Sequence, residues 1–298
     1  MFESYVWTDD TRGKKCNFAT LSQIRSCFEM KTIYFNGFTS SGATGTVELL
    51  RRMLPVIFHL RRILDSLVIC LFVTACSLTG KVTLSDVGEV RVTCPEALKY
   101  LPGYPSFDDR EAFFNDSLYY RRGFALRDTE RGRQAVIDAQ NNLDFYLKRF
   151  GAAMGADLSE EDTPAIARYL KTTYSFARSG ISTAKDAFSR QRPYSYFNET
   201  SAVPEDEAAF GAFTSYPSGH SIRAWAITLA LIAIDDQHQY EIIKVGNELC
   251  ESRIITGFHY VSDVEAAKLA ASIAFAKIVS DPEYIKLMEL ACHELKKQ

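Results

Sequence analysis

Three short segments of the 298-residue sequence combine cationic, histidine and small residues in patterns that suit an anionic ligand; they lie at residues 185–193, 217–220 and 252–263. Arginine offers planar, paired hydrogen bonds to a phosphate or carboxylate, and lysine offers a compact positive charge. If the fold brings the three segments together, they can surround one tetrahedral oxyanion. Each segment also has an ordinary structural interpretation.

The first segment contains Lys185 and Arg192, seven residues apart. On one helix this spacing is about two turns, so both side chains would point the same way, and Pro193 would fix the exit from that helix. Basic residues in a run more often form a solvated face, which is the better interpretation of this segment alone. Arg190 lies in the same run and is assigned no role.

The second segment, Pro217-Ser218-Gly219-His220, is typical of a transition from loop to helix. The first turn of a helix has free N–H groups and a partial positive charge, and small Ser218 and Gly219 would let an anion approach them. His220 could stand at the rim as a proton donor. A simple capping turn with an unrelated histidine is equally compatible with this segment.

The third segment places Arg253 six residues before His259, and Asp263 four residues after it. On a helix, His259 and Asp263 would share one face, where the carboxylate would fix the ring tautomer and leave the other ring nitrogen nucleophilic. A surface His–Asp pair is the slightly better interpretation of this segment alone. The three segments taken together favour an anion site over that surface pair, since two of only five histidines fall in them.

The elements that must position these residues are predicted to be helices. After residue 96 the sequence has no convincing strand pattern or repeat, which predicts a single all-α domain over 108–298. Residues 221–234 would place apolar side chains on almost every side of a helix, so that helix should be central and buried. The expected helices span 108–122, 125–150, 163–177, 179–190, 218–234, 239–257, 261–279 and 282–296.

Composition excludes several other classes. Hydrophobic residues make up 47% of the chain and charged residues 24%, which fits a globular core, and the net charge of -3 does not call for nucleic acid. The seven cysteines contain no C-x-x-C pair, and no second cluster suggests a metal site. No stretch of the helical region reaches the roughly 18 apolar residues of a membrane span.

An export signal is predicted at residues 53–76, where arginines precede a short apolar run. The sequence Val73-Thr74-Ala75-Cys76 suits signal cleavage and also resembles a lipobox, so plain cleavage and lipid anchoring through Cys76 stay open. Residues 1–52 are interpreted as a mis-assigned or non-structural extension, and 77–107 as an extended segment that wraps over a core. Export predicts a periplasmic or outer-membrane-associated protein.

The pattern K-x6-R-P, P-S-G-H and S-R-x5-H-x3-D resembles the signature of the phosphatidic acid phosphatase type 2 superfamily. Residues 126–135, 215–216 and 255–264 are similar to one branch, the bacterial class A nonspecific acid phosphatases, and the resemblance covers roughly residues 96–280. The run 101–105 departs from relatives, which tend to be proline-rich there. The resemblance implies a helical acid phosphatase that needs no cofactor or metal.

The resemblance also implies roles for individual residues. His259 would attack phosphorus and form a phosphohistidine, Asp263 would orient its ring, and His220 would protonate the leaving group and then activate water. The phosphate would be bound by Lys185, Arg192, Ser218, Gly219 and Arg253. Broad specificity for small phosphomonoesters, an acidic optimum, inhibition by vanadate, phosphotransfer to alcohols and a homo-oligomer are expected.

Three alternatives remain open at this point. A vanadium-dependent haloperoxidase resembles the same superfamily and would hold vanadate with the same phosphate-binding residues. A lipid-phosphate phosphatase would use the same chemistry, although such proteins carry several membrane spans. A non-catalytic phosphate-binding lipoprotein is the least favoured, because every catalytic position is filled.

Overall fold

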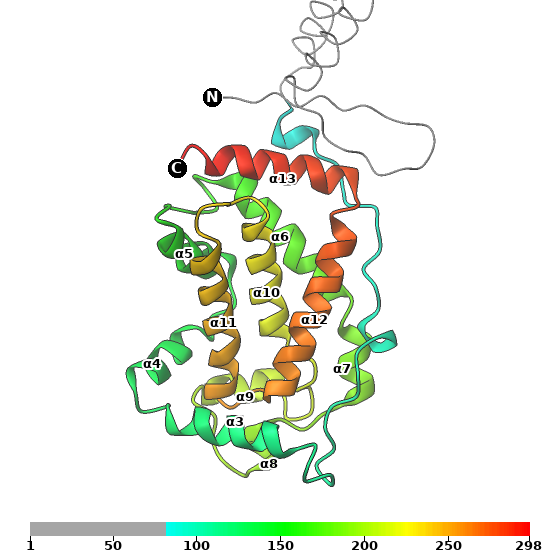
Figure 1. Ribbon diagram of the computed structural model, residues 1–298, viewed down its shortest axis with the longest axis vertical. Helices are drawn as coiled ribbons and strands as arrows, with labels where there is room; N and C mark the ends of the chain where they lie inside the picture. The colour runs from blue at the N-terminus through cyan, green and yellow to red at the C-terminus, as the bar shows by residue number, and fades with distance from the viewer. Residues whose placement is uncertain (1–81) are drawn as a thin grey trace, which may run out of the picture. The chain divides into compact units, whose positions relative to one another are not determined.

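The structure is a computed structural model that describes residues 82–298. These residues lie in one compact unit. The extension predicted at residues 1–52 and the export signal predicted at 53–76, with Cys76, lie outside the described residues. Within 82–298 all regular structure is helical, which confirms the predicted all-α class (Figure 1).

Helix α10 (Gly219–Ile232) lies at the centre of the bundle. It packs against α6 (Pro164–Ser179), α11 (Gln239–Ile255) and α12 (Val261–Ile278), as Figure 1 shows. Because its apolar residues surround the helix axis, every face of α10 can be buried, as predicted. The central helix therefore gives the surrounding helices a common partner.

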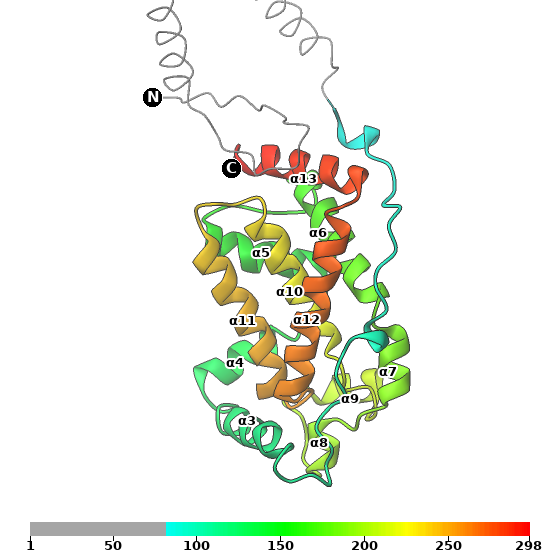
Figure 2. The same cartoon turned by 45° about the vertical axis from the view of Figure 1, so that its right-hand side comes forward.

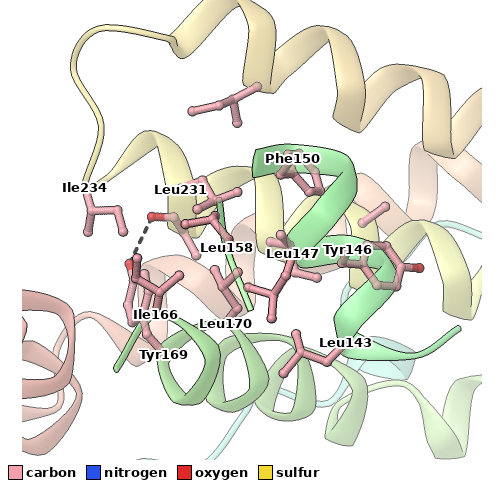
Figure 3. Close-up of a cluster of buried hydrophobic side chains, with 14 of the residues drawn as sticks. Leu143, Tyr146, Leu147, Phe150, Leu158, Ile166, Tyr169, Leu170, Leu231 and Ile234 are labelled. Carbon is pink, nitrogen blue, oxygen red and sulfur yellow. Dashed lines mark hydrogen bonds between the residues drawn. The ribbon is translucent and has the colours of Figure 1, made fainter. Parts of the chain in front are cut away.

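A cluster of large apolar side chains joins α10 to α6 and to α5 (Leu143–Met154) (Figure 3). Leu147, Phe150, Ile166 and Leu231 are fully buried there, and each such side chain stabilises the fold by roughly 1.5–3 kcal/mol. The hydroxyl of Tyr169 on α6 donates to the carbonyl of Ala230 at 3.1 Å, so its polar atom is also satisfied.

The single helix predicted over 125–150 is wrong. The structure has α4 (Glu130–Ile137) and then α5, which begins after Asn142. The Asn142 side chain accepts a hydrogen bond from the Phe145 N–H at 2.8 Å, and asparagine favours such a cap over a helix interior. The helix predicted at 108–122 is α3 (Phe114–Ala125), shifted toward the C-terminus.

The region between the first two predicted segments also differs from expectation. The helix predicted at 179–190 is the shorter α7 (Ser182–Phe188), which ends where Ser189 adopts a left-handed conformation with φ 43°. Two short helices that were not predicted follow, α8 (Pro193–Tyr196) and α9 (Pro204–Phe210), each with proline at its first position. They bring the chain back toward α10.

The later helices match the prediction closely. Helix α11 begins at Gln239, α12 at Val261, and α13 (Pro282–Leu295) packs against α6. Asp281 caps α13, since its carboxylate accepts from the Glu283 and Tyr284 N–H groups. Its second oxygen accepts from the backbone of Arg91 at 2.7 Å, which ties the extended N-terminal segment to the bundle (Figure 2).

That N-terminal segment contains two 3-10 turns, η1 (Leu84–Asp86) and η2 (Ala97–Lys99). The Ala97 N–H donates to the Gly180 carbonyl at 2.8 Å, and the Tyr216 hydroxyl donates to the Pro102 carbonyl at 2.5 Å. The segment thus runs beside the bundle from α13 to the region of α7 (Figure 2). Cys94, Cys250 and Cys292 form no disulfide with one another.

Three helix ends meet at one end of the bundle, beside α8 and α9: the start of α10, the end of α11 and the start of α12 (Figures 1 and 2). The second and third segments singled out in the sequence lie on these ends, and the first segment runs from α7 into α8. Of the helices in residues 82–298, none combines the length and the apolar character that crossing a bilayer would take.

Candidate active site

A cavity of about 240 Å³ opens at this end of the bundle. Six of the eight predicted site residues line it: Lys185, Arg192, Gly219, His220, Arg253 and His259. Asp263 and Ser218 do not line the cavity and lie behind it, at the starts of α12 and α10. The structure therefore brings the three segments together around one small space.

His259 is buried between the cavity and a carboxylate. Its Nε2 lies 3.2 Å from a terminal nitrogen of Arg192, and its Nδ1 lies 3.4 Å from Oδ2 of Asp263. The expectation that His259 and Asp263 share a helix face is wrong, because His259 precedes α12, whose cap is Tyr260. The loop immediately before α12 still brings the His259 ring to the Asp263 carboxylate.

Asp263 is fully buried and held on both oxygens. The guanidinium of Arg190 donates to Oδ1 at 2.5 Å, while the Ser215 hydroxyl and the Tyr260 N–H donate to Oδ2 at 2.5 and 2.9 Å. Hydrogen bonds to an ionised carboxylate are stronger than neutral ones and fix its orientation. The oxygen that faces His259 is thus held in place by a hydroxyl and a backbone amide.

Arg190, which the sequence gave no reason to select, is a fully buried residue of this site. It bridges Asp263 and Asp116, donating to Oδ2 of Asp116 at 2.6 Å, and its guanidinium lies 4.0 Å from the centre of the Tyr260 ring. Burial would lower the pKa of Arg190, but the two carboxylates outweigh it and raise the pKa. The assumption of a solvated basic run is wrong at this position.

Asp116 on α3 extends the same network. Its Oδ2 accepts from the Ser262 hydroxyl at 2.6 Å, and its Oδ1 accepts from the Ser262 N–H at 2.9 Å. A buried carboxylate of this kind is tolerated only when it is paired and hydrogen-bonded. Sequence reasoning missed Asp116, which lies in no distinguishing pattern, and it gave Ser215 no role although residues 215–216 belong to the family resemblance.

Lys185 and Arg192 converge although they do not share a helix. Helix α7 ends before Arg192, which caps α8, so the two-turn geometry expected for the pair is wrong. The Thr214 carbonyl accepts from Lys185 Nζ at 2.8 Å, and the Thr214 hydroxyl accepts from Arg192 at 2.9 Å. Arg192 also donates to the Gly211 and Phe258 carbonyls at 2.8 and 3.0 Å, which fixes its plane.

Arg253 and His220 contribute buried nitrogen atoms that have no hydrogen-bond partner among residues 82–298. These are Nε and one terminal nitrogen of Arg253 and Nε2 of His220. Arg253 packs its guanidinium 4.9 Å from the Phe258 ring centre, and His220 meets the Phe210 ring edge-on at 5.5 Å. An unpaired buried polar group costs about 1–3 kcal/mol, and an anion in the cavity could offset that cost for these two residues.

The start of α10 also suits an anion. The Ser218 hydroxyl accepts from the Ser221 N–H at 3.3 Å and caps the helix, as the sequence predicts, so its oxygen is directed at the helix and not at the cavity. Gly219 and His220 occupy the first turn, where N–H groups have no partner within the helix. A side-chain carbon at Gly219 would project toward Lys185, whose Cε lies 3.6 Å from that position.

Burial and mutual repulsion lower the pKa values of the cavity's basic groups. Burial, and then Arg192, lowers the pKa of Lys185 to about 7, and burial lowers the pKa of Arg192 and of Arg253 to about 10. The pKa values of His220 and His259 fall well below the ordinary range, chiefly through burial and then through the neighbouring arginines. An anion in the cavity would offset this repulsion.

Within residues 82–298, no three His, Cys, Asp or Glu side chains are grouped in a way that could hold a metal ion. The cavity instead presents basic side chains, among them Lys185, Arg192 and Arg253. Three cations and two histidines around a small space form an arrangement that can bind a phosphoryl group and place a nucleophile beside it.

Comparison with known proteins places the chain in a family. Residues 168–281 match the PAP2 superfamily. A non-specific acid phosphatase of Providencia stuartii is 37% identical over 186 residues, which cover 62% of this chain and 75% of that protein. A non-specific acid phosphatase of Salmonella typhimurium is 31% identical over 197 residues, 66% of this chain and 78% of that protein.

An acid phosphatase of Zymomonas mobilis is similar over a slightly shorter stretch, at 31% identity over 172 residues, or 58% of this chain and 65% of that protein. Residues 168–281, which match the PAP2 superfamily, contain all three segments of the cavity, and the resemblance inferred from the motifs is confirmed. The chain belongs to the PAP2 superfamily, within its branch of bacterial class A acid phosphatases.

Proposed function

We propose that this protein is an acid phosphatase that hydrolyses small phosphomonoesters through a phosphohistidine on His259. The observation that carries the proposal is that Arg253 and His220, whose buried nitrogens have no partner among the described residues, line one cavity of about 240 Å³ together with His259. A phosphoryl group would satisfy these donors, and the two relatives are named non-specific acid phosphatases.

In the first step the lone pair on His259 Nε2 attacks phosphorus, and the bond from phosphorus to the ester oxygen breaks. His220 gives its proton to the departing oxygen. Arg192, Lys185 and Arg253 neutralise the phosphoryl oxygens while charge moves from one side of phosphorus to the other. The first-turn N–H groups of α10 add hydrogen bonds.

In the second step water attacks the phosphohistidine. His220, now neutral, takes a proton from that water, the phosphorus–nitrogen bond breaks, and inorganic phosphate leaves with its oxygens still paired to the cations. The electron pair returns to His259 Nε2, so both histidines regain their starting state. An alcohol in place of water would give phosphotransfer, which the same geometry permits.

Asp263 and Arg190 act in this scheme as positioning residues. The carboxylate of Asp263 faces Nδ1 of His259, so it favours the tautomer whose Nε2 lone pair points into the cavity. It also stabilises the positive charge that the ring gains when phosphorus bonds to it. Arg190 and Asp116 hold that carboxylate in one orientation.

The charge state of the cavity favours acidic conditions. Lys185 carries its full charge only below its pKa of about 7, so anion binding should weaken as the pH rises through that value. His220 must be protonated for the first step, and a bound phosphate dianion beside it would raise its depressed pKa. Both effects favour an acidic optimum.

We also propose export through the segment at residues 53–76, on the sequence pattern alone. Peptide mass mapping of the secreted protein tests this proposal. An N-terminus at or next to Cys76 would support it, and peptides from residues 1–50 in the exported protein would contradict it. Lipidation would add a mass increment to the Cys76 peptide, and plain cleavage would not.

The decisive assay for the activity is hydrolysis of p-nitrophenyl phosphate at pH 5–6 in the presence of a chelator. Turnover that His259→Ala abolishes supports the proposal, as does competitive inhibition by vanadate, which resembles five-coordinate phosphorus. Bromide oxidation with vanadate and peroxide, without phosphatase turnover, would instead indicate a haloperoxidase. Tight phosphate binding without either reaction would indicate a binding protein.

A further inference from the structure

One cation in the cavity is not used by the proposed reaction. Arg178 lies in the last turn of α6 and lines the same cavity as Lys185 and His259. Unlike Arg192 and Arg253, which are almost fully buried, Arg178 is exposed. It therefore stands where the cavity opens to solvent.

Within the described part of the chain, Arg178 has no acidic partner. No carboxylate among residues 82–298 lies within ion-pairing distance of its guanidinium, whereas Arg131 and Arg149 each pair with a glutamate of α11. Its charge is felt inside the cavity: burial and Arg192 lower the pKa of Lys185 most, and Arg178 lowers it further. Arg178 is thus close to the proposed phosphate cage (Lys185, Arg192 and Arg253) without being part of it.

The wall beside Arg178 is built for a polar group. Asn141, just before the cap of α5, lines the cavity, and its carbonyl accepts a hydrogen bond from the nearly buried Arg223 of α10. The Arg223 guanidinium packs 4.6 Å from the ring centre of Tyr174, one turn before Arg178 on α6. Arg178 and Asn141 therefore line the cavity, and Arg223 contacts Asn141 and Tyr174 without lining it.

The charges of the cavity lining suggest that the leaving group would lie beside Arg178 and Asn141. The cavity lining contains four cations, Lys185, Arg192, Arg253 and Arg178, and no carboxylate. The phosphoryl group engages the first three, and the remainder of the substrate is the part that must lie toward the opening. An anion on that part would meet Arg178 without displacing an existing partner.

We propose that Arg178 binds a second anionic group on the substrate, so that phosphomonoesters whose leaving group carries a phosphate or a carboxylate are the preferred class. This inference rests on the proposed phosphatase function, since it assumes that the first phosphate occupies the cage. Arg178 is a specificity-determining residue in this scheme, and the cage itself performs the chemistry.

Calorimetric titration with phosphonates tests the proposal, because their carbon–phosphorus bonds are not hydrolysed. Methylphosphonate has one anionic group, while phosphonoacetate adds a carboxylate and methylenebisphosphonate adds a second phosphonate. In Arg178→Gln we expect Kd to rise about tenfold for at least one of the two-anion ligands and to change less than twofold for methylphosphonate, as for one exposed charge-assisted contact. Arg178→Lys should retain most of the affinity.

A matched control is Arg91→Gln, since Arg91 is also exposed and lies next to Asp281, where α13 begins. This variant should bind all three ligands as the wild type does. An effect of Arg178→Gln on both two-anion ligands means that any anion suffices, and an effect on one of them identifies the preferred group. Equal ratios of two-anion to one-anion affinity in wild type and Arg178→Gln would overturn the inference.

The same experiment separates this inference from the activity. If the wild type fails to hydrolyse p-nitrophenyl phosphate, the proposed function fails, and the phosphonate titration still reports on Arg178. If the wild type is active, kcat/KM for phosphoglycolate relative to ethyl phosphate should fall about tenfold in Arg178→Gln. An unchanged ratio with normal p-nitrophenyl phosphate turnover would reject the role of Arg178 alone.

Discussion

Arg190 donates to Asp263 at 2.5 Å through the carboxylate oxygen that does not bind Ser215 or face His259. Both partners are fully buried, so the ion pair is shielded from water on every side. Because breaking one half of a buried pair leaves an uncompensated charge, the contact is sensitive to small changes. It connects Asp263, the carboxylate that would orient the proposed nucleophile His259, to Arg190, which does not line the cavity.

Replacing Arg190 with glutamine should lower kcat about 10- to 100-fold and change KM less than threefold, since the phosphate cage remains intact while His259 loses its fixed carboxylate. The measurement is steady-state kinetics with p-nitrophenyl phosphate. The control is Arg149→Gln, which breaks the ion pair with Glu248 and should lower Tm while leaving kcat unchanged. A proportional loss of activity and stability in both variants would mean that Arg190 is only structural.

Asp263→Asn should reduce kcat by roughly three to four orders of magnitude, as expected for a catalytic histidine that loses its orienting carboxylate. The amide can no longer accept on both sides from Arg190 and Ser215. Circular dichroism should show the wild-type helix content, although Tm should fall. Near-wild-type turnover in a folded variant would refute the orienting role.

His220→Ala should affect substrates according to their leaving groups. General acid catalysis contributes about 100- to 10,000-fold, and a leaving group that is stable as an anion needs it least. Ethyl phosphate hydrolysis should therefore fall much further than the first step with p-nitrophenyl phosphate. Rapid-quench measurements should also show the phosphorylated enzyme accumulating, because water is no longer activated. Equal losses on both substrates would assign His220 to binding.

Sulfate inhibition should depend on pH through Lys185. Sulfate remains a dianion across the range, so its inhibition constant reports on the protein alone. Since the pKa of Lys185 is lowered to about 7, its charge is present below that pH and lost above it, and sulfate should bind more weakly as the pH rises. Lys185→Gln should bind sulfate more weakly at pH 5.5 and should flatten the dependence near pH 7.

Gly219→Ala should retain stability but lose affinity. The added methyl would meet Lys185 Cε at 3.6 Å, an ordinary contact, so Tm should change little. The same methyl would occupy space at the helix start where the anion would lie, and KM should rise at least tenfold. Gly246→Ala is the contrasting variant, because its methyl would collide with Thr228 of α10 and should destabilise the fold instead.

Much of the fold follows from periodicity. The helix beginning at Pro164 and the buried helix after Ser218 were predictable because a capping residue, a proline or an all-round apolar pattern marked them. The break before Asn142 was missed, although two adjacent asparagines signalled it. Helix α9 was missed too, although Pro204 followed by acidic residues is a typical helix start.

The site was predictable where chemistry demands a residue type and unpredictable where packing decides. Lys185, Arg253 and His259 belong to patterns that suit a phosphate. Arg190 carries the same charge as its neighbours, and only the three-dimensional structure shows that it turns inward to meet Asp116. A charged side chain gives no sign in the sequence of whether water or a carboxylate will surround it.

The Ser218 N–H donates to the backbone carbonyl of Asp263 at 3.1 Å. This hydrogen bond joins the start of α10, which would bind the phosphate, to Asp263, which would orient the nucleophile. The two should therefore move together. Directed evolution of this enzyme should find few tolerated changes across that junction, because any shift would misalign the attacking nitrogen and its target together. Variation that alters selectivity should accumulate instead around Arg178 and Asn141, where side chains can change without moving either helix.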